Sequence, residues 1–421
     1  MVKKKNKLSE QARIKIEQAR YRKLYFEKFE YYCDTYGGKG TYALIPPNYR
    51  AGLFVYRIQP FKIVTDTNSK IDSKTHKYIH TLLFQALHYM NVTIGDHLPT
   101  IRLDDFFVYG QAIRALSYIE KEVPAKLWNT EFARRLERFV DTEVLDRAID
   151  EVFDVMTNVG TMLSHIQNHI VWLDCEFNES NTTGSIQNIA RLHIHKPTFK
   201  HFLLPDGSRP GYRVSWYIKP DGIKEISIKL SQWDPSSSFA DLPIAVYIQS
   251  HALQRLWERI DVYTPYLVQM NMLISLAKPV IIRTGKTSGL LEYSINGNKY
   301  GYLVCELIDG DILIKTFLFL TNNGTPEGKK LNELSGLSKN DKKYLAIDRI
   351  SSFITSDIEH NKTLKELFIQ SGCKSLVYAA EHLNFEKEKF SQFDSSTFIA
   401  EYIKKEPVPI IEESYLFHSA E

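Results

Sequence analysis

The spacing of apolar residues changes twice along this chain, and each change alters the kind of structure that the chain can form. Before about residue 180 the apolar residues recur at helical spacing, from Ile189 they alternate as in β-strands, and after Thr325 helical spacing returns. A helix and a strand bury one face at different periods, so neither pattern suits the other element. The sequence therefore predicts an α+β fold with a mainly helical N-terminal half, a central antiparallel β-rich region and a helical C-terminal region.

These changes divide the 421 residues into four predicted ranges. Residues 1–50 form a basic helical arm and linker, 51–180 a mainly helical domain, 181–336 a β-rich region and 337–421 a helical C-terminal region. In the second range a β-like segment precedes four expected helices: Leu53–Val64, then His76–Met90, Asp104–Lys121, Thr130–Phe139 and Glu143–Trp172. In the third, Pro220-Asp221-Gly222 predicts a hairpin between Tyr212–Ile218 and Lys224–Leu230.

Residues 244–325 predict a subdomain in which two helices precede a four-stranded meander. Pro243–Ile248 has the pattern of a short apolar strand, Ser250 is expected to cap the first helix, and Tyr263–Ala277 is expected to form the second. The expected strands and tight turns are Val280–Thr284, Leu290–Ile295, Lys299–Ile308 and Asp311–Thr321, with turns at Asn296-Gly297-Asn298 and Asp309-Gly310. Thr325 is expected to cap a further helix, with Pro326 in its first turn.

The first helix of this subdomain separates its side chains by chemistry. At 100° per residue, His251, Arg255 and Arg259 share one flank, and the other flank carries Leu253, Leu256, Trp257 and Ile260. Guanidinium groups can clamp phosphate oxygens, and imidazole groups exchange protons near neutral pH. The flank can therefore hold a phosphodiester, and the alternative is the solvated face of an ordinary amphipathic helix.

The same stretch, YIQSHALQRLWERID, resembles the opening of the small ribonuclease-toxin domains related to RelE and BrnT. The positions that match are Ser250, His251, Ala252, Leu253, Arg255, Glu258 and Arg259, and Gln249 stands where those domains usually carry Lys. The resemblance covers residues 244–321 at most, under a fifth of the chain.

The resemblance implies RNA cleavage without a metal or another cofactor. The 2′-hydroxyl would attack the adjacent phosphorus while arginines stabilise the charge that builds up. His251 is then the candidate acid or base, and Arg255 and Arg259 are candidate phosphate ligands. Secondary candidates are Lys315 and Thr321 as catalytic residues and Arg283 as an RNA contact. The alternative for Lys315 is a lysine that reaches the edge of the sheet.

Basic residues are concentrated at the N-terminus. Residues 1–28 carry a charge of +7, against +3 for the whole chain. A helical pattern from Ser9 to Tyr32 makes this segment an expected arm for RNA or another polyanion, or else a docked terminal helix with a solvated basic face. The candidate nucleic-acid contacts in it are Lys3, Lys4, Lys5, Arg13, Arg20, Arg22 and Lys23.

Composition restricts the remaining classes. Four widely spaced cysteines, Cys33, Cys175, Cys305 and Cys373, indicate neither a disulfide framework nor a zinc knuckle. No apolar run is long enough for a membrane span, and the basic N-terminus leads into no apolar core of a secretory signal. We expect a cytoplasmic protein without a metal site, although His165 with His169, one helical turn apart, and His193 with His195 have ligand spacing.

Two functions of different classes remain open. One is an RNA-binding or metal-independent RNA-cleaving protein of the toxin-like type, with the helical regions restraining, targeting or assembling it. The other is a non-catalytic structural or interaction protein with protein partners, such as a component of a phage or another mobile element. The length of 421 residues favours the second, because single-domain toxins of this type are short.

Overall fold

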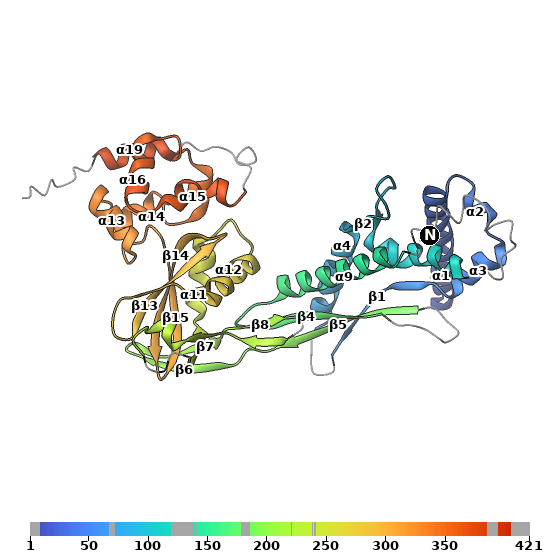
Figure 1. Ribbon diagram of the computed structural model, residues 1–421, viewed down its shortest axis with the longest axis horizontal. Coiled ribbons are helices and arrows are strands. Elements are labelled where there is room, and N and C mark those ends of the chain that lie inside the picture. The colour runs from blue at the N-terminus through green and yellow to red at the C-terminus, as the bar shows by residue number, and fades with distance from the viewer. Residues whose placement is uncertain are drawn as a thin grey trace, which may run out of the picture. The chain divides into compact units, whose positions relative to one another are not determined.

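The computed structural model describes residues 9–66, 72–118, 139, 141–177, 186–219, 221–237, 239, 241–384 and 395–405. Helices and sheets are both present, so the predicted α+β class is confirmed (Figure 1). The chain forms two compact units, which is a coarser division than the four ranges expected from the sequence. The first unit comprises Met1–Ser164 and Val171–His195, and the second comprises His165–Ile170 and Lys196–Glu421.

The first unit places its helices around a three-stranded sheet of order β1-β5-β4, in which β1 and β5 run parallel. Its helices are α1 (Glu10–Gly37), α2 (Thr41–Leu44), α3 (Pro47–Val55), α4 (Ser73–Tyr89), α5 (Leu103–Asp105), the π-helix η1 (Phe106–Gly110), α6 (Gln111–Tyr118) and α9 (Thr142–Leu163). Its strands are β1 (Ile58–Thr65), β2 (Asn91–Val92), β3 (Ile101–Arg102), β4 (Ile170–Glu176) and β5 (Ile186–His195).

Helix α9 lies directly against β4. A Cβ atom on Gly160 would come 2.8 Å from the carbonyl oxygen of Val171, so this helix approaches the strand as only glycine allows. The expected helix Glu143–Trp172 is wrong in its last part, because Ser164 ends α9 and its side chain hydrogen-bonds the backbone of Val171 at the start of the strand.

One further expectation in this unit is wrong, and another falls almost entirely on residues that the structure does not describe. Leu53–Val64 is strand only from Ile58, because Pro47 begins a helix that runs through Val55. The expected helix Thr130–Phe139 lies, except for Phe139, outside the described residues.

A buried carboxylate joins α1 to the start of the π-helix in the first unit. Asp105 is 4% exposed and accepts hydrogen bonds from Tyr32 Oη at 2.6 Å, from Lys28 Nζ at 2.9 Å and from the guanidinium of Arg102. Burial alone would raise the pKa of Asp105, but the bonds from Tyr32, Lys28 and Arg102 outweigh it and hold this pKa below its ordinary value.

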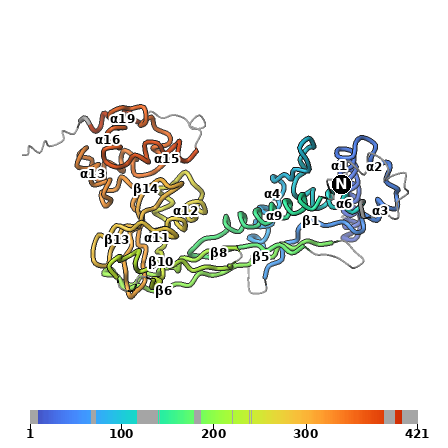
Figure 2. Tube along the Cα trace, in the orientation of Figure 1, coloured from blue at the N-terminus to red at the C-terminus, as the bar shows by residue number. Residues whose placement is uncertain are grey.

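The second unit is built on an eight-stranded sheet of order β12-β13-β14-β15-β11-β7-β6, with β10 paired to β11. Figure 2 labels β6, β10, β13 and β14 of this sheet along the Cα trace. Its strands are β6 (Phe199–Leu204), β7 (Gly207–Arg213), β8 (Ser215–Ile218), β9 (Gly222–Glu225), β10 (Ser227–Lys229), β11 (Pro243–Ile248), β12 (Ile281–Arg283), β13 (Ser288–Ile295), β14 (Asn298–Ile308) and β15 (Asp311–Phe319). Its helices are α10 (Leu230–Trp233), α11 (Ser250–Arg259), α12 (Pro265–Ala277), α13 (Pro326–Ser335), α14 (Lys339–Tyr344), α15 (Ile350–Thr355), α16 (Lys362–Gln370), α17 (Lys374–Val377), α18 (Ala379–His382) and α19 (Ser395–Lys405).

The predicted order of two helices and then a four-stranded meander is confirmed from α11 to β15. Asn296 and Asp309 adopt positive φ angles of 51° ahead of Gly297 and Gly310, which closes the two predicted hairpins. The central sheet is not purely antiparallel, however, because β11 pairs with β15 in parallel. The chain reaches this parallel neighbour only after two helices and three strands, and such long connections carry no local sequence signal.

The predicted hairpin forms over Ser215–Ile218 and Gly222–Glu225, and both predicted arms are wrong in part: Tyr212 belongs to β7, and residues 227–230 belong to β10 and the start of α10. Thr325 caps α13 as predicted, since its hydroxyl accepts the Gly328 amide. Within the described ranges, no helix combines the length and the apolar character needed to cross a membrane.

Candidate functional site

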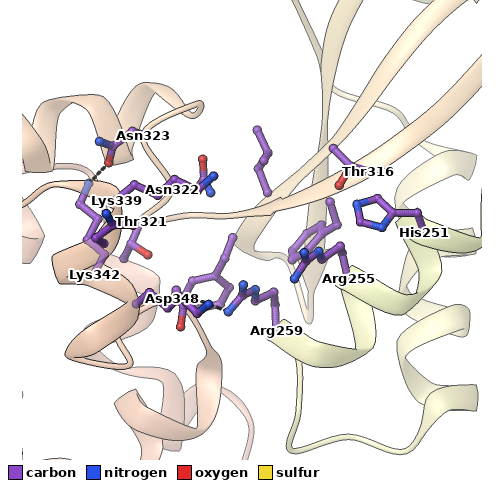
Figure 3. A pocket seen from close by; sticks show the side chains of 15 residues that line it. His251, Arg255, Arg259, Thr316, Thr321, Asn322, Asn323, Lys339, Lys342 and Asp348 are labelled. Carbon is purple, nitrogen blue, oxygen red and sulfur yellow. Dashed lines mark hydrogen bonds and ion pairs between the residues drawn. The ribbon is translucent and has the colours of Figure 1, made fainter. Parts of the chain in front are cut away.

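Helix α11 positions the predicted site residues by its spacing. Strand β11 ends at Ile248, the helix begins at Ser250, and His251, Arg255 and Arg259 follow at intervals of four residues on one flank (Figure 3). The opposite flank is buried as predicted, with Leu253, Leu256 and Ile260 fully covered and Trp257 half-buried. The predicted cap is wrong: Gln249 occupies the N-cap position, and no side chain caps the helix there.

The three residues line one cavity of about 430 Å³ in the second unit. The end of β15 forms another wall, and the turn after it together with α14 closes the opposite side (Figure 3). The lining residues are His251, Arg255, Arg259, Thr316, Phe317, Leu318, Phe319, Thr321, Asn322, Asn323, Lys339, Asn340, Lys342, Lys343 and Asp348. Five of these described residues have basic side chains, namely Arg255, Arg259, Lys339, Lys342 and Lys343. Only Asp348 among them carries a carboxylate.

That carboxylate neutralises one of the arginines. Arg259 donates a hydrogen bond to Asp348 Oδ2, and the two side chains are 20% and 15% exposed. The other oxygen of Asp348, Oδ1, is buried and has no hydrogen-bond partner in the described part of the chain, and its ion pair with Arg349 Nε is long at 3.9 Å. An acceptor atom of Asp348 is therefore left over in a cavity that is otherwise basic.

Arg255 is held differently. Its partner is Glu258 on the same helix at 2.8 Å, and both side chains are about two-fifths exposed, at 43% and 40%. Exposed pairs of this kind contribute about 0 to 1 kcal/mol and rearrange easily. Arg255 can therefore leave Glu258 for an anion in the cavity at little cost.

Lys342 lines the cavity from α14. Its side chain is buried, and its Nζ atom donates to Gly328 O at 2.7 Å and to Asn323 Oδ1. Burial lowers the pKa of Lys342 to about 8, because desolvation disfavours the charged form. An anion in the cavity would favour the ammonium form, so binding and the protonation of Lys342 should be coupled.

The secondary candidates, Lys315, Thr321 and Arg283, each form hydrogen bonds or ion pairs within the protein. Lys315 lies on β15 inside the sheet and not at its edge, pairs with Glu306 of β14 at 2.6 Å, and does not line the cavity. Thr321 lines the cavity but is fully buried, and its hydroxyl donates to Ile347 O at 2.7 Å. Arg283 on β12 is exposed, donates to the carbonyl groups of Trp233, Gly285 and Lys286, and does not line the cavity.

The candidate contacts of the N-terminal arm lie on α1 in the first unit. Every described residue from Ser9 to Leu24 is exposed except the half-buried Ala12, and this range includes Arg13, Arg20, Arg22 and Lys23. From Tyr25 the helix packs into the core of the first unit, and the guanidinium of Arg22 lies over the rings of Phe26 and Phe54. Lys3, Lys4 and Lys5 lie outside the described residues.

The sequence reasoning missed the opposite wall of the cavity. Lys339, Lys342 and Lys343 come from α14, about 80 positions beyond α11, and Asp348 follows that helix. The lysines in and after the capping box of Ser338 and Asp341 are visible in the sequence, but only the tertiary fold brings them to the cavity that His251 lines.

Neither histidine pair with ligand spacing belongs to a metal-binding group among the described residues. His165 and His169 lie in a turn closed by the bond from His165 N to His169 O and not one helical turn apart. His193 stacks on Trp172 with its Nε2 atom 2.9 Å from Asp174. In the part of the chain that the structure describes, no group of three or more His, Cys, Asp or Glu residues is arranged to hold a metal ion.

Comparisons of this chain with protein-family models, with curated proteins and with solved structures find no match. The chemistry of the cavity is therefore the basis for a functional assignment.

Proposed function

We propose that the second unit binds single-stranded RNA, with a backbone phosphate seated in the cavity between α11 and α14. One observation carries this proposal: cationic side chains from two elements far apart in the sequence converge on one cavity of about 430 Å³. Lysine and arginine groups that surround a phosphate release condensed counterions and supply most of the affinity for nucleic acids. A cavity of this kind suits a phosphodiester better than an uncharged or cationic ligand.

We further propose that the bound RNA is cleaved by its own 2′-hydroxyl. In this reaction the 2′-oxygen bonds to phosphorus, the bond to the 5′-oxygen breaks, and a 2′,3′-cyclic phosphate and a 5′-hydroxyl result. The proton of the 2′-hydroxyl passes to the proton-transfer group, and the same group, once protonated, delivers a proton to the 5′-oxygen, so it ends the step unchanged. His251 is the proposed proton-transfer group, and Arg255 stabilises the charge on the phosphorane. RNA is the proposed substrate because DNA lacks the nucleophile.

A specific observation favours the non-catalytic alternative as the second candidate. The Arg259–Asp348 pair and the bond from Thr321 to Ile347 O both link the region from α11 to β15 with the helices that follow it. Such contacts can serve only to hold the C-terminal helices on the sheet. In that case the cavity is a structural junction, and its variants change stability without changing any affinity for RNA.

Fluorescence anisotropy of a labelled single-stranded RNA distinguishes the two candidates. Arg255→Ala should weaken binding to every sequence and reduce the slope of log Kd against log salt by about one, because one phosphate contact is lost. Lys286→Ala is the matched control, since Lys286 is exposed and does not line the cavity. Equal weakening by both variants, or by neither, would contradict the proposed site.

Cleavage is tested on the same RNA in the presence of EDTA. We expect products with 2′,3′-cyclic phosphate ends and a rate about 10²-fold lower for Arg255→Ala, since charge stabilisation in the transition state is lost. Expression of wild type and of the His251→Ala/Arg255→Ala double variant should differ in growth arrest and in RNA integrity. Intact RNA across pH 5 to 9 with the folded wild type would end the catalytic part of the proposal and leave RNA binding to stand on the anisotropy result.

A further inference from the structure

A second hollow lies next to the cavity between α11 and α14, at the N-terminus of α11. It has a volume of about 420 Å³ and lies in the second unit, where the β6–β7 hairpin approaches the start of the helix. Its lining residues are Leu204, Asp206, Arg209, Pro210, Gln249, Ser250 and His251. His251 lines both hollows, so the two spaces share this residue.

The two hollows differ in charge. The second holds one arginine, Arg209, and that residue is already paired with Asp206 at 3.2 Å. Leu204 and Pro210 contribute apolar surface, and Gln249 and Ser250 contribute an amide and a hydroxyl. A lining without net charge, partly apolar and partly amide, suits a flat uncharged group with hydrogen-bonding edges. The volume of the hollow lies within the range of about 300 to 1,000 Å³ that is usual for ligand sites.

Gln249 supplies a hydrogen-bonding group that none of the described residues uses. The backbone of Gln249 is satisfied, because its N–H donates to Ile314 O and its carbonyl accepts from the amides of Ala252 and Leu253. Its side-chain Nε2, in contrast, is buried and has no hydrogen-bond partner among the described residues, and this side chain does not cap the helix. A buried donor without a partner is costly, so an acceptor on a bound group would be favoured there after a small rotation of the amide.

We propose that this second hollow receives the base of the nucleotide next to the phosphate bound between α11 and α14, and that Gln249 reads the edge of that base. The proposal rests on the proposed RNA binding of the same unit and adds its sequence preference. Proteins recognise single-stranded RNA by stacking unpaired bases on aromatic or arginine side chains and by bonding to their edges. Arg209 is the stacking group and Gln249 the reading group. Phosphate and base then lie on either side of His251.

The test uses fluorescently labelled oligomers of equal length made of adenosine, cytidine or uridine, together with an abasic ribose-phosphate oligomer. Wild type should bind one homopolymer about tenfold more tightly than the weakest of the three, because one well-placed edge contact discriminates bases by about that factor. The abasic oligomer should bind most weakly. Gln249→Met keeps the length of the side chain but removes its hydrogen bonds, and it should reduce the preference to about threefold or less without changing the salt slope.

Gln254→Met is the matched control. Gln254 lies on the same helix, is exposed, and donates to Glu258 outside both hollows, so its replacement should leave the preference unchanged. Circular dichroism and thermal unfolding verify that both variants fold.

The outcomes separate the two proposals. If Arg255→Ala weakens binding but the wild type binds all oligomers equally, or Gln249→Met keeps the full preference, the base site is refuted and phosphate binding stands. If Arg255→Ala has no effect on binding, the proposed RNA site is refuted and the base site falls with it. A preference that Gln249→Met reduces and Gln254→Met does not supports both.

Discussion

The carboxylate of Asp348 acts within the proposed site as a built-in competitor of the RNA phosphate. It holds Arg259, and it is the only carboxylate among the described residues that line the cavity. Replacing it by Asn keeps the size of the side chain and an acceptor for Arg259 but removes the negative charge. The Asp348→Asn variant should therefore bind RNA more tightly than the wild type.

The size of the gain follows from the charges. Two unit charges about 7 Å apart repel each other by about 2 kcal/mol at an effective dielectric constant of about 20, and screening in an open cavity reduces this to about 1 kcal/mol. A gain of about 1 to 2 kcal/mol lowers Kd by about 5- to 30-fold. The same change removes the charge partner of a guanidinium that is only 20% exposed, so the free energy of unfolding should fall by about 1 to 2 kcal/mol.

Anisotropy titration and urea unfolding of the same protein preparations measure both effects. Glu258→Gln provides the matched control, because Glu258 also pairs with an arginine of α11 but lies on the exposed surface outside the cavity. We expect that control to change Kd by less than about threefold. A folded Asp348→Asn protein with unchanged or weaker RNA binding would refute the competition between this carboxylate and the phosphate.

Three further predictions concern pH, stability and the arm. Asp105→Ala should lower the free energy of unfolding by about 3 kcal/mol at pH 7 in urea titrations, because three hydrogen-bond donors lose their acceptor. Since the pKa of Asp105 is below its ordinary value when the protein is folded, its stabilisation is present at neutral pH, and the difference between variant and wild type should shrink as pH falls below about 4. RNA affinity should decrease as pH rises from 7 to 9, because Lys342, with its pKa lowered to about 8, loses its charge in that range, and a flat profile would separate Lys342 from binding. Deletion of residues 1–20, which spares the buried Tyr25, should reduce the salt slope of polyanion binding, and an unchanged slope would assign the arm no role.

Local patterns were sufficient to predict the region from β11 to β15. Asn296-Gly297 and Asp309-Gly310 predict their hairpins because few other residues adopt the positive φ angles these turns require. Helix α11 was predictable because its apolar and polar residues separate so clearly. The parallel pairing of β11 with β15 was not, since it depends on how distant segments meet and not on the pattern within either strand.

The candidate site was predictable only in part and for the same reason. The helical spacing alone places His251, Arg255 and Arg259 on one flank, and the structure brings all three to one cavity. Lys342 and Asp348 have no feature in the sequence that directs them toward that flank, because their position depends on the packing of α14 against the turn after β15. Lys315 was misplaced because one strand pattern cannot show that its neighbouring strand offers Glu306 as a partner.

Hydrogen–deuterium exchange of the full chain, with and without single-stranded RNA, tests the central claim most directly. The claim predicts slower exchange of backbone amides in 249–259 and 339–343 when RNA is bound, since these segments form the two sides of the cavity. The Arg255→Ala variant should lose that protection at the same RNA concentration. Protection that is confined to α1 at saturating RNA, or that leaves both segments unchanged, would contradict the assignment of the cavity as the RNA site.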